Sequence, residues 1–187
     1  SYGVYIIASY GGAATSTISN NTIARNAETG IRIGSDGPHD NEQNVYITNN
    51  YIADNSYGGI HIFDENVNVF IRYNRIHNNN APNGSALYIR DESSLGLDTV
   101  EYNTITGGTG TSLIYKYQGN PTIRNNNFVH KSETYLVYDN RYVGENATFD
   151  FENNWWGTTD EVEVSELIYE LYDNVNLGLV TYIPMLN

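Results

Sequence analysis

The chain lacks cysteine, is poor in basic residues and contains no long apolar run. Without cysteine it can form neither a disulfide framework nor a catalytic thiolate. Its 9 Lys and Arg residues stand against 22 Asp and Glu residues, for a formal net charge of −13. A protein that binds duplex nucleic acid needs basic side chains against the phosphates, so this charge argues against a nucleic-acid partner. No stretch approaches the roughly 18 apolar residues that span a bilayer, and we expect no membrane insertion.

Asparagine, by contrast, is abundant and recurs with a period. It accounts for 27 of the 187 residues, although it is unfavourable inside isolated helices and ordinary strands. In six segments an apolar residue lies three positions before an Asn and another lies two positions after it. These Asn residues are Asn21, Asn50, Asn74, Asn103, Asn126 and Asn154. A repeat at intervals of this kind is typical of a solenoid.

A second short strand-like segment follows each of the first five Asn positions, at residues 30–33, 59–62, 86–89, 112–115 and 135–138. Each coil thus has two or three short strands, too few to bury a core alone, and stacking would close a common interior. The pattern predicts an all-β, right-handed parallel β-helix of about six or seven coils over residues 1–157. Residues 3–6 resemble the same strand of a coil whose beginning is missing, so we expect an upstream domain or end-to-end self-association at this N-terminal coil.

The repeated Asn has a structural explanation. At a bend its side chain offers both a donor and an acceptor, and Asn tolerates the left-handed backbone. Identical amides stacked at the strand spacing of about 4.8 Å can bond along the column. We therefore expect a structural Asn ladder. A second column, one residue past the first apolar position of each coil, reads Ser19, Thr48, Arg72, Glu101, Arg124 and Glu152, and its alternating charges favour ion pairs between adjacent coils.

The last part of the chain, residues 158–187, departs from the repeat but is expected to belong to the same domain. Residues 161–172 place Val164, Leu167, Ile168 and Leu171 at helical spacing after acidic residues, which predicts a helix that caps the last coil. Residues 177–184 predict one final strand.

Together, the repeats and the segment Asn153-Asn154-Trp155-Trp156-Gly157-Thr158 resemble the right-handed parallel β-helix (pectate-lyase-like) superfamily. The resemblance implies a carbohydrate ligand and an extracellular or cell-surface location. It leaves the activity open, because members include polysaccharide lyases, glycoside hydrolases, tailspikes and adhesins.

The best candidate site is the outward column of the second strands, which we expect to read Tyr5, Arg32, His61, Tyr88, Ile114 and Val137. The expected glycan-binding residues are Tyr5, Arg32, His61, Phe63, Tyr88 and Arg90. If the chain is an enzyme, His61 is the candidate acid or base and Arg32 would hold a uronate carboxylate. Asp64 and Asp91 would then be paired carboxylates or ligands of Ca²⁺, the one cofactor considered. The Asp-Asp pair and Gly-His-Gly segment of the glycosidase branch do not occur.

Three functions follow as hypotheses. The leading one is a secreted or cell-surface spacer or adhesin-like module that binds polysaccharide along one face without catalysis. The second is a polysaccharide lyase or glycoside hydrolase that acts on acidic glycans. The third is a structural subunit of a surface layer or filament.

Overall fold

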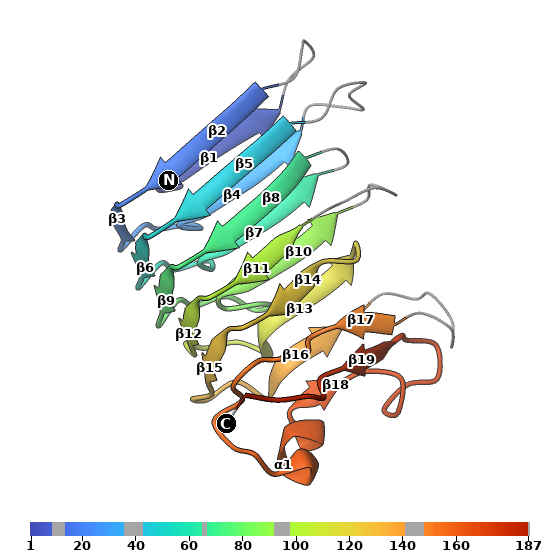
Figure 1. The fold of residues 1–187 in the computed structure, drawn as a ribbon. Coiled ribbons are helices and arrows are strands. Elements are labelled where there is room, and N and C mark those ends of the chain that lie inside the picture. The colour runs from blue at the N-terminus through green and yellow to red at the C-terminus, as the bar shows by residue number, and fades with distance from the viewer. Residues whose placement is uncertain (9–13, 36–42, 65–66, 92–97, 141–147, 187) are drawn as a thin grey trace.

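Three sheets of parallel strands surround one core. The structure is a computed structural model that describes residues 1–8, 14–35, 43–64, 67–91, 98–140 and 148–186. Each coil contributes one strand to sheet A, then one to sheet B and one to sheet C, and the next coil repeats this order. Neighbouring strands in each sheet therefore come from successive coils (Figure 1). All the pairings between these strands are parallel. The expected parallel β-helix is confirmed.

Sheet A has seven strands: β1 Val4–Ala8, β4 Ile31–Ser35, β7 Ile60–Asp64, β10 Leu87–Asp91, β13 Ser112–Gln118, β16 Tyr135–Asp139 and β18 Ile168–Tyr169. Sheet B has five: β2 Ala14–Ser19, β5 Gln43–Thr48, β8 Val67–Arg72, β11 Thr99–Glu101 and β14 Thr122–Arg124. Sheet C also has five: β3 Thr22–Ala24, β6 Tyr51–Ala53, β9 Arg75–His77, β12 Thr104–Thr106 and β15 Asn127–Val129.

Five coils therefore carry a strand in all three sheets within the described residues, fewer than the six or seven expected. The difference arises after β16. Strand β17, Thr148–Asp150, pairs with β19, Leu179–Thr181, in a separate two-stranded sheet, and Trp155 continues sheet C only by an isolated bridge to Asn127.

Aliphatic side chains from all three sheets fill the interior. Residues such as Ile33, Ile47 and Ile76 are completely buried, each in a different sheet. Strand alternation sends every second side chain inward, and the parallel register places equivalent residues of successive coils over one another. The core is thus continuous along the solenoid axis.

The Asn ladder is confirmed over all six positions. From Asn21 to Asn126, each side-chain Nδ2 donates to the Oδ1 of the next ladder Asn at 3.0 to 3.3 Å. The backbone N–H of each of these residues donates to the same oxygen. From Asn50 onward, Nδ2 also bonds a backbone carbonyl of the preceding coil. The ladder thus satisfies buried backbone groups at the bend between sheets B and C.

The left-handed backbone belongs to the residue before each ladder Asn, where we had expected it at the ladder Asn itself. These preceding residues are Asn20, Asn49, Tyr73, Tyr102, Asn125 and Asn153, with φ between 56° and 59°. The left-handed residue thus precedes the ladder Asn, and the ladder side chain points into the coil.

A second, shorter ladder follows sheet C and was not foreseen. Asn26, Asn55 and Asn79 repeat the same hydrogen bonds, with Nδ2 to Oδ1 distances of 2.8 Å. In the next coil Gly108 follows at this bend, and its backbone N–H bonds the buried carboxylate of Glu133. A glycine is needed there, because an added Cβ would overlap the carbonyl oxygen of Asn79.

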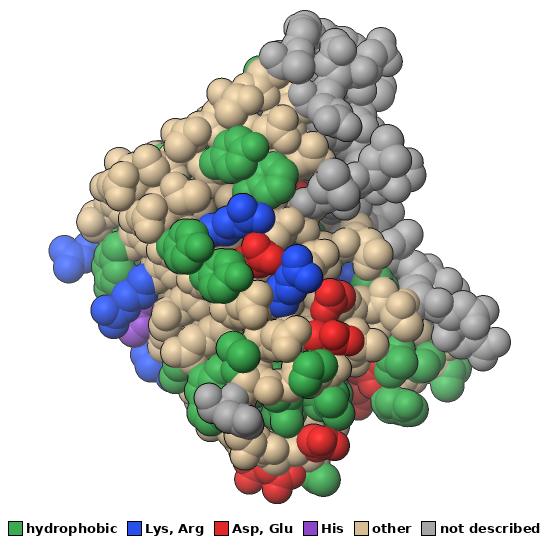
Figure 2. All heavy atoms as spheres, in the orientation of Figure 1, with side chains coloured by type: hydrophobic (Ala, Val, Ile, Leu, Met, Phe, Trp, Pro, Cys, Tyr) green, Lys and Arg blue, Asp and Glu red, His purple; other side chains and the backbone are tan. Residues whose placement is uncertain are grey.

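The charge column on sheet B is confirmed at its centre. Glu101 accepts from Arg72 at 3.2 Å on one side and from Arg124 at 2.8 Å on the other. Glu152, the last member of the expected column, lies in the turn after β17 and not in a strand. Figure 2 shows this face, where basic and acidic side chains lie among hydrophobic ones.

The C-terminal helix is present but shorter than expected. Helix α1 spans Glu161–Glu166, with Asp160 as its N-cap, and lies at the end of the solenoid that holds the last coils (Figure 1). Val164 is its one buried residue. Ile168, expected in the helix, instead begins β18 and pairs with Val137 of sheet A. The helix ends early because the chain must extend again to add this strand.

Candidate functional site

The outer face of sheet A carries one column of polar and aromatic side chains. Tyr5 lies opposite Arg32, Arg32 opposite His61 and His61 opposite Tyr88, as the sequence predicts. Beyond Tyr88 the expected column is wrong. Tyr115, Tyr138 and Tyr169 continue it, whereas Ile114 and Val137 are fully buried in the core. The register of β13 is shifted by one residue from the expected one, since Leu87 lies opposite Ile114.

The tyrosines of this column stack on one another. Ring centroids are 5.3 Å apart between Tyr88 and Tyr115 and between Tyr115 and Tyr138, and the rings are within 14° of parallel. Tyr138 and Tyr169 stack at 4.5 Å. Each of these rings covers the face of its neighbour. Sugar rings stack on exposed aromatic faces, so this part of the column serves coil packing and offers a ligand mainly ring edges and hydroxyl groups.

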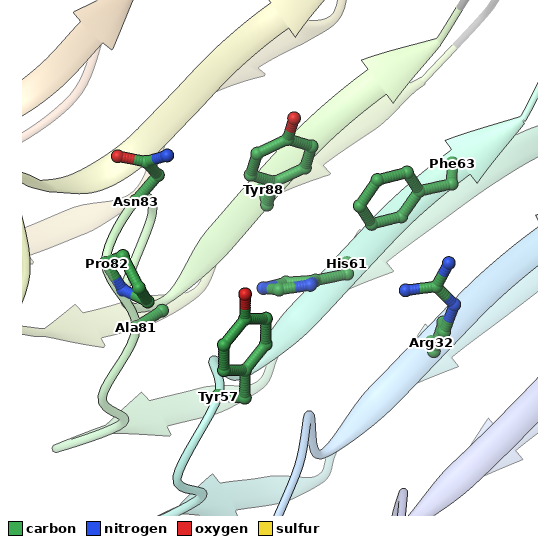
Figure 3. A pocket seen from close by; sticks show the side chains of 8 residues that line it. All are labelled: Arg32, Tyr57, His61, Phe63, Ala81, Pro82, Asn83 and Tyr88. Atoms are coloured by element: carbon green, nitrogen blue, oxygen red, sulfur yellow. The ribbon is translucent and has the colours of Figure 1, made fainter.

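A cleft of about 220 Å³ opens at the other end of the column. Arg32, His61, Phe63 and Tyr88 line it from strands β4, β7 and β10, as Figure 3 shows. Two connecting segments supply the remaining wall. Tyr57 lies in the turn before β7, and Ala81, Pro82 and Asn83 lie in the loop between β9 and β10. The side chains of Tyr57, Tyr88 and Asn83 border the same space in Figure 3.

Arg32 is the cationic group of the cleft. Its guanidinium carbon lies 4.4 Å from the centre of the Phe63 ring and within 6 Å of the rings of Tyr2 and Tyr5. These cation–π contacts hold the guanidinium in place. Among the described residues no carboxylate forms an ion pair with Arg32. An oriented guanidinium of this kind can bind a planar anion through two parallel hydrogen bonds.

His61 lies under the cleft and is only 3% exposed. Its Nδ1 is 3.3 Å from the Thr29 hydroxyl, and its Nε2 has no hydrogen-bond partner among the described residues. A Cβ on Gly58 would come within 2.4 Å of Nε2, so this nitrogen faces the backbone of the preceding turn. Burial, and secondarily the charge of Arg32, lowers the pKa of His61 to about 4. The ring is therefore neutral at pH 7, and neither nitrogen is presented to the cleft for proton transfer.

The other expected site residues are placed as follows. Tyr5 is 48% exposed and contacts Arg32, but it does not line the cleft. Arg90 is exposed outside the cleft, with its guanidinium 5.5 Å from the Tyr117 ring. Asp64 and Asp91 end strands β7 and β10 in register with each other. Their side chains lie outside the described part of the structure, so their expected roles remain predictions.

Four residues that line the cleft were not predicted from the sequence: Tyr57, Ala81, Pro82 and Asn83. Tyr57 precedes Gly58-Gly59, and residues 81–83 precede Gly84, so both segments carry turn signals. These signals indicate bends, but they do not say which way a side chain in the bend points.

No three His, Asp or Glu side chains of the described segments lie close enough together to hold a metal ion. The Ca²⁺ expectation concerned Asp64 and Asp91, whose side chains those segments leave out. None of the helices in the same segments has the length and apolar character needed to cross a bilayer.

Comparison with known proteins agrees with the fold. The family model described as a right handed beta helix region matches residues 1–156. The chain belongs to this family. No curated protein and no solved structure matches it. Membership of the right-handed β-helix family accounts for the coils but does not specify a ligand, because one fold hosts many functions.

Proposed function

We propose that this chain is a non-catalytic β-helix module of a secreted or cell-surface protein, and that its cleft binds an acidic sugar residue of a polysaccharide. The observation that carries the proposal is Arg32, an oriented guanidinium at an aromatic-lined cleft, with no described carboxylate paired to it. In a chain with a net charge of −13, such a cation is a specific attraction for a single anionic group.

The cleft offers complementary groups for a uronate ring. Arg32 can bind the carboxylate through two hydrogen bonds. Tyr57 is 54% exposed, and its ring can pack against the apolar face of the sugar. The Asn83 amide and the Tyr88 hydroxyl can bond sugar hydroxyl groups. Pockets for drug-sized ligands occupy about 300–1,000 Å³. A cleft of about 220 Å³ therefore suits one sugar residue rather than a longer segment.

The burial of His61 supports binding without catalysis. A general acid or base must come within hydrogen-bond reach of the proton it transfers. The two nitrogens of His61 face Thr29 and Gly58 instead. A guanidinium donates hydrogen bonds and accepts none, so Arg32 suits the binding of an anion better than the abstraction of a proton.

The test is a calorimetric titration with oligosaccharides of uronic acids and with neutral hexose oligosaccharides of equal length. We expect binding of the acidic series only. Arg32→Gln should weaken it about tenfold or more, because a hydrogen bond to a charged group contributes about 1.5–3 kcal/mol. Arg124→Gln is the matched control, since this exposed arginine lies on sheet B and pairs with Glu101.

Equal binding of acidic and neutral sugars, or an unchanged affinity in Arg32→Gln, would contradict the proposal. The same mixtures are then assayed for new reducing ends and unsaturated products. Turnover that the Arg32→Gln variant loses would replace the binding module with an enzyme.

A further inference from the structure

A buried lysine and a buried aspartate face each other inside the solenoid, away from the cleft. Lys116 of β13 lies opposite Asp139 of β16 in the register of sheet A. Both side chains are fully buried, with 0% exposure each. Lys116 Nζ is 2.9 Å from Asp139 Oδ1. An amine and a carboxyl group, the two groups from which an amide bond forms, are thus held together in the core.

The surroundings of this pair are apolar on one side. The Phe149 ring lies directly against the amine, with its centroid 3.2 Å from Nζ. The neighbouring inward residues, Ile114 and Val137, are fully buried. Removing an ammonium and a carboxylate from water is costly, and their mutual attraction often fails to repay it. Conversion of the pair into a neutral amide removes both charges from the core.

A second acid, Glu170, continues the same inward column. Tyr169 lies opposite Tyr138, so Glu170 occupies the position of the next coil that corresponds to Asp139. Glu170 is 7% exposed, and its Oε2 accepts a hydrogen bond from the Val180 N–H at 3.1 Å. Burial raises the pKa of this carboxyl group, which favours its protonated form. Glu170 directly follows β18, at the end of the column that holds Lys116 on β13 and Asp139 on β16.

We propose that Lys116 Nζ and Asp139 Cγ condense into an isopeptide bond that joins β13 to β16. Both groups lie on fixed strands, so the reaction is intramolecular and needs little reorganisation. The neutral amine of a lysine held against a carboxyl carbon can act as a nucleophile.

The balance of the step is simple. A proton passes from the ammonium to the carboxylate, and the neutral amine attacks Cγ of the neutral acid. The C–N bond forms, one C–O bond of Asp139 breaks, and one water molecule leaves with a proton from the amine. No oxidant or reductant is required.

The decisive experiment is the intact mass of the purified, denatured chain. The bond lowers the mass below the sequence value by one water molecule. A tryptic digest should then contain a branched peptide that links the segments around Lys116 and Asp139. A mass equal to the sequence value overturns the proposal, and the pair is then a buried ion pair. This result is independent of sugar binding, so it does not bear on the cleft.

Variants give a second signature. Asp139→Asn should lose ammonia instead of water, so the cross-linked variant has the same mass as the cross-linked natural chain. Lys116→Met should show its full sequence mass, and Lys131→Met, which alters the other lysine, should still lose one water molecule. Retention of the mass loss in Lys116→Met would overturn the assignment of the bond.

Discussion

The Asn ladder predicts that the same substitution has very different costs at its centre and at its first member. The Asn74 side chain takes part in five hydrogen bonds: three from its Nδ2, to Ile47 O, Arg72 O and Asn103 Oδ1, and two to its Oδ1, from Asn50 Nδ2 and Asn50 N. Asn74 is only 2% exposed, so water cannot readily replace these bonds.

Asn74→Ala should lower the free energy of unfolding by about 3–5 kcal/mol, since each of the five bonds contributes about 0.5–1.5 kcal/mol net and the Asn50 N–H is left buried without its acceptor. Asn21→Ala is the control in the same column. The exposed Asn21 side chain makes two bonds, to Ser19 O and to Asn50 Oδ1, so its loss should cost about 1 kcal/mol.

The assay is equilibrium unfolding in urea followed by far-ultraviolet circular dichroism and by tryptophan fluorescence. With a slope of about 2 kcal/mol per molar urea, Asn74→Ala should move the midpoint by about 2 M and Asn21→Ala by about 0.5 M. Separate midpoints for the two probes would show that the coils unfold in stages, as solenoids can. Equal costs for the two variants would refute the hydrogen-bond account of the ladder.

Three further predictions concern stability. The pKa of His61 is lowered from 6.5 to about 4, so the stability that the neutral ring contributes is fully present above pH 6.5 and is lost as the pH falls toward 4. The free energy of unfolding should drop by about 2 kcal/mol between pH 7.5 and 5. A drop of equal size in His61→Gln would contradict this cause. Gly58→Ala should cost about 2–3 kcal/mol in urea unfolding, because φ is +107° and the new Cβ would collide with His61. Gly157→Ala, with φ +87° and no contact closer than Phe128 O at 3.9 Å, should cost about 1 kcal/mol. Glu101→Gln should cost about 1 kcal/mol at low salt and less at high salt, since its arginine partners are partly exposed; a cost that does not change with salt would argue against the ion pairs.

The coil repeat was predictable because every coil needs the same chemistry at the same bend. The inward amide of Asn50 donates to the amide of Asn74 one coil later, and the same contact in each coil appears in the sequence as a periodic Asn. The second ladder was not predicted because it has only three members. In the next coil Gly108 occupies the equivalent position, and the carboxylate of Glu133 accepts its N–H in place of an Asn side chain.

The cleft was predictable in part. Arg32, His61 and Tyr88 share a column, and strand alternation alone places them on one face. The burial of His61 was not predictable, since it depends on how closely the backbone of Gly58 approaches the ring. The outward position of Tyr115 was missed because β13 lies in a short repeat, where the sequence does not show which residue of the segment begins the pairing.

The ladder also gives the solenoid a chemical direction. Between the ladder amides every hydrogen bond runs from the Nδ2 of one coil to the Oδ1 of the coil after it, and none runs in the opposite sense. Asn21 donates to Asn50 and presents an Oδ1 that takes no bond from the described residues. The two faces of a coil are therefore not interchangeable. A further coil stacked on the first one would continue the ladder only if it brought N–H donors to this oxygen. This requirement fixes both the register of such a coil and the direction of its hydrogen bonds.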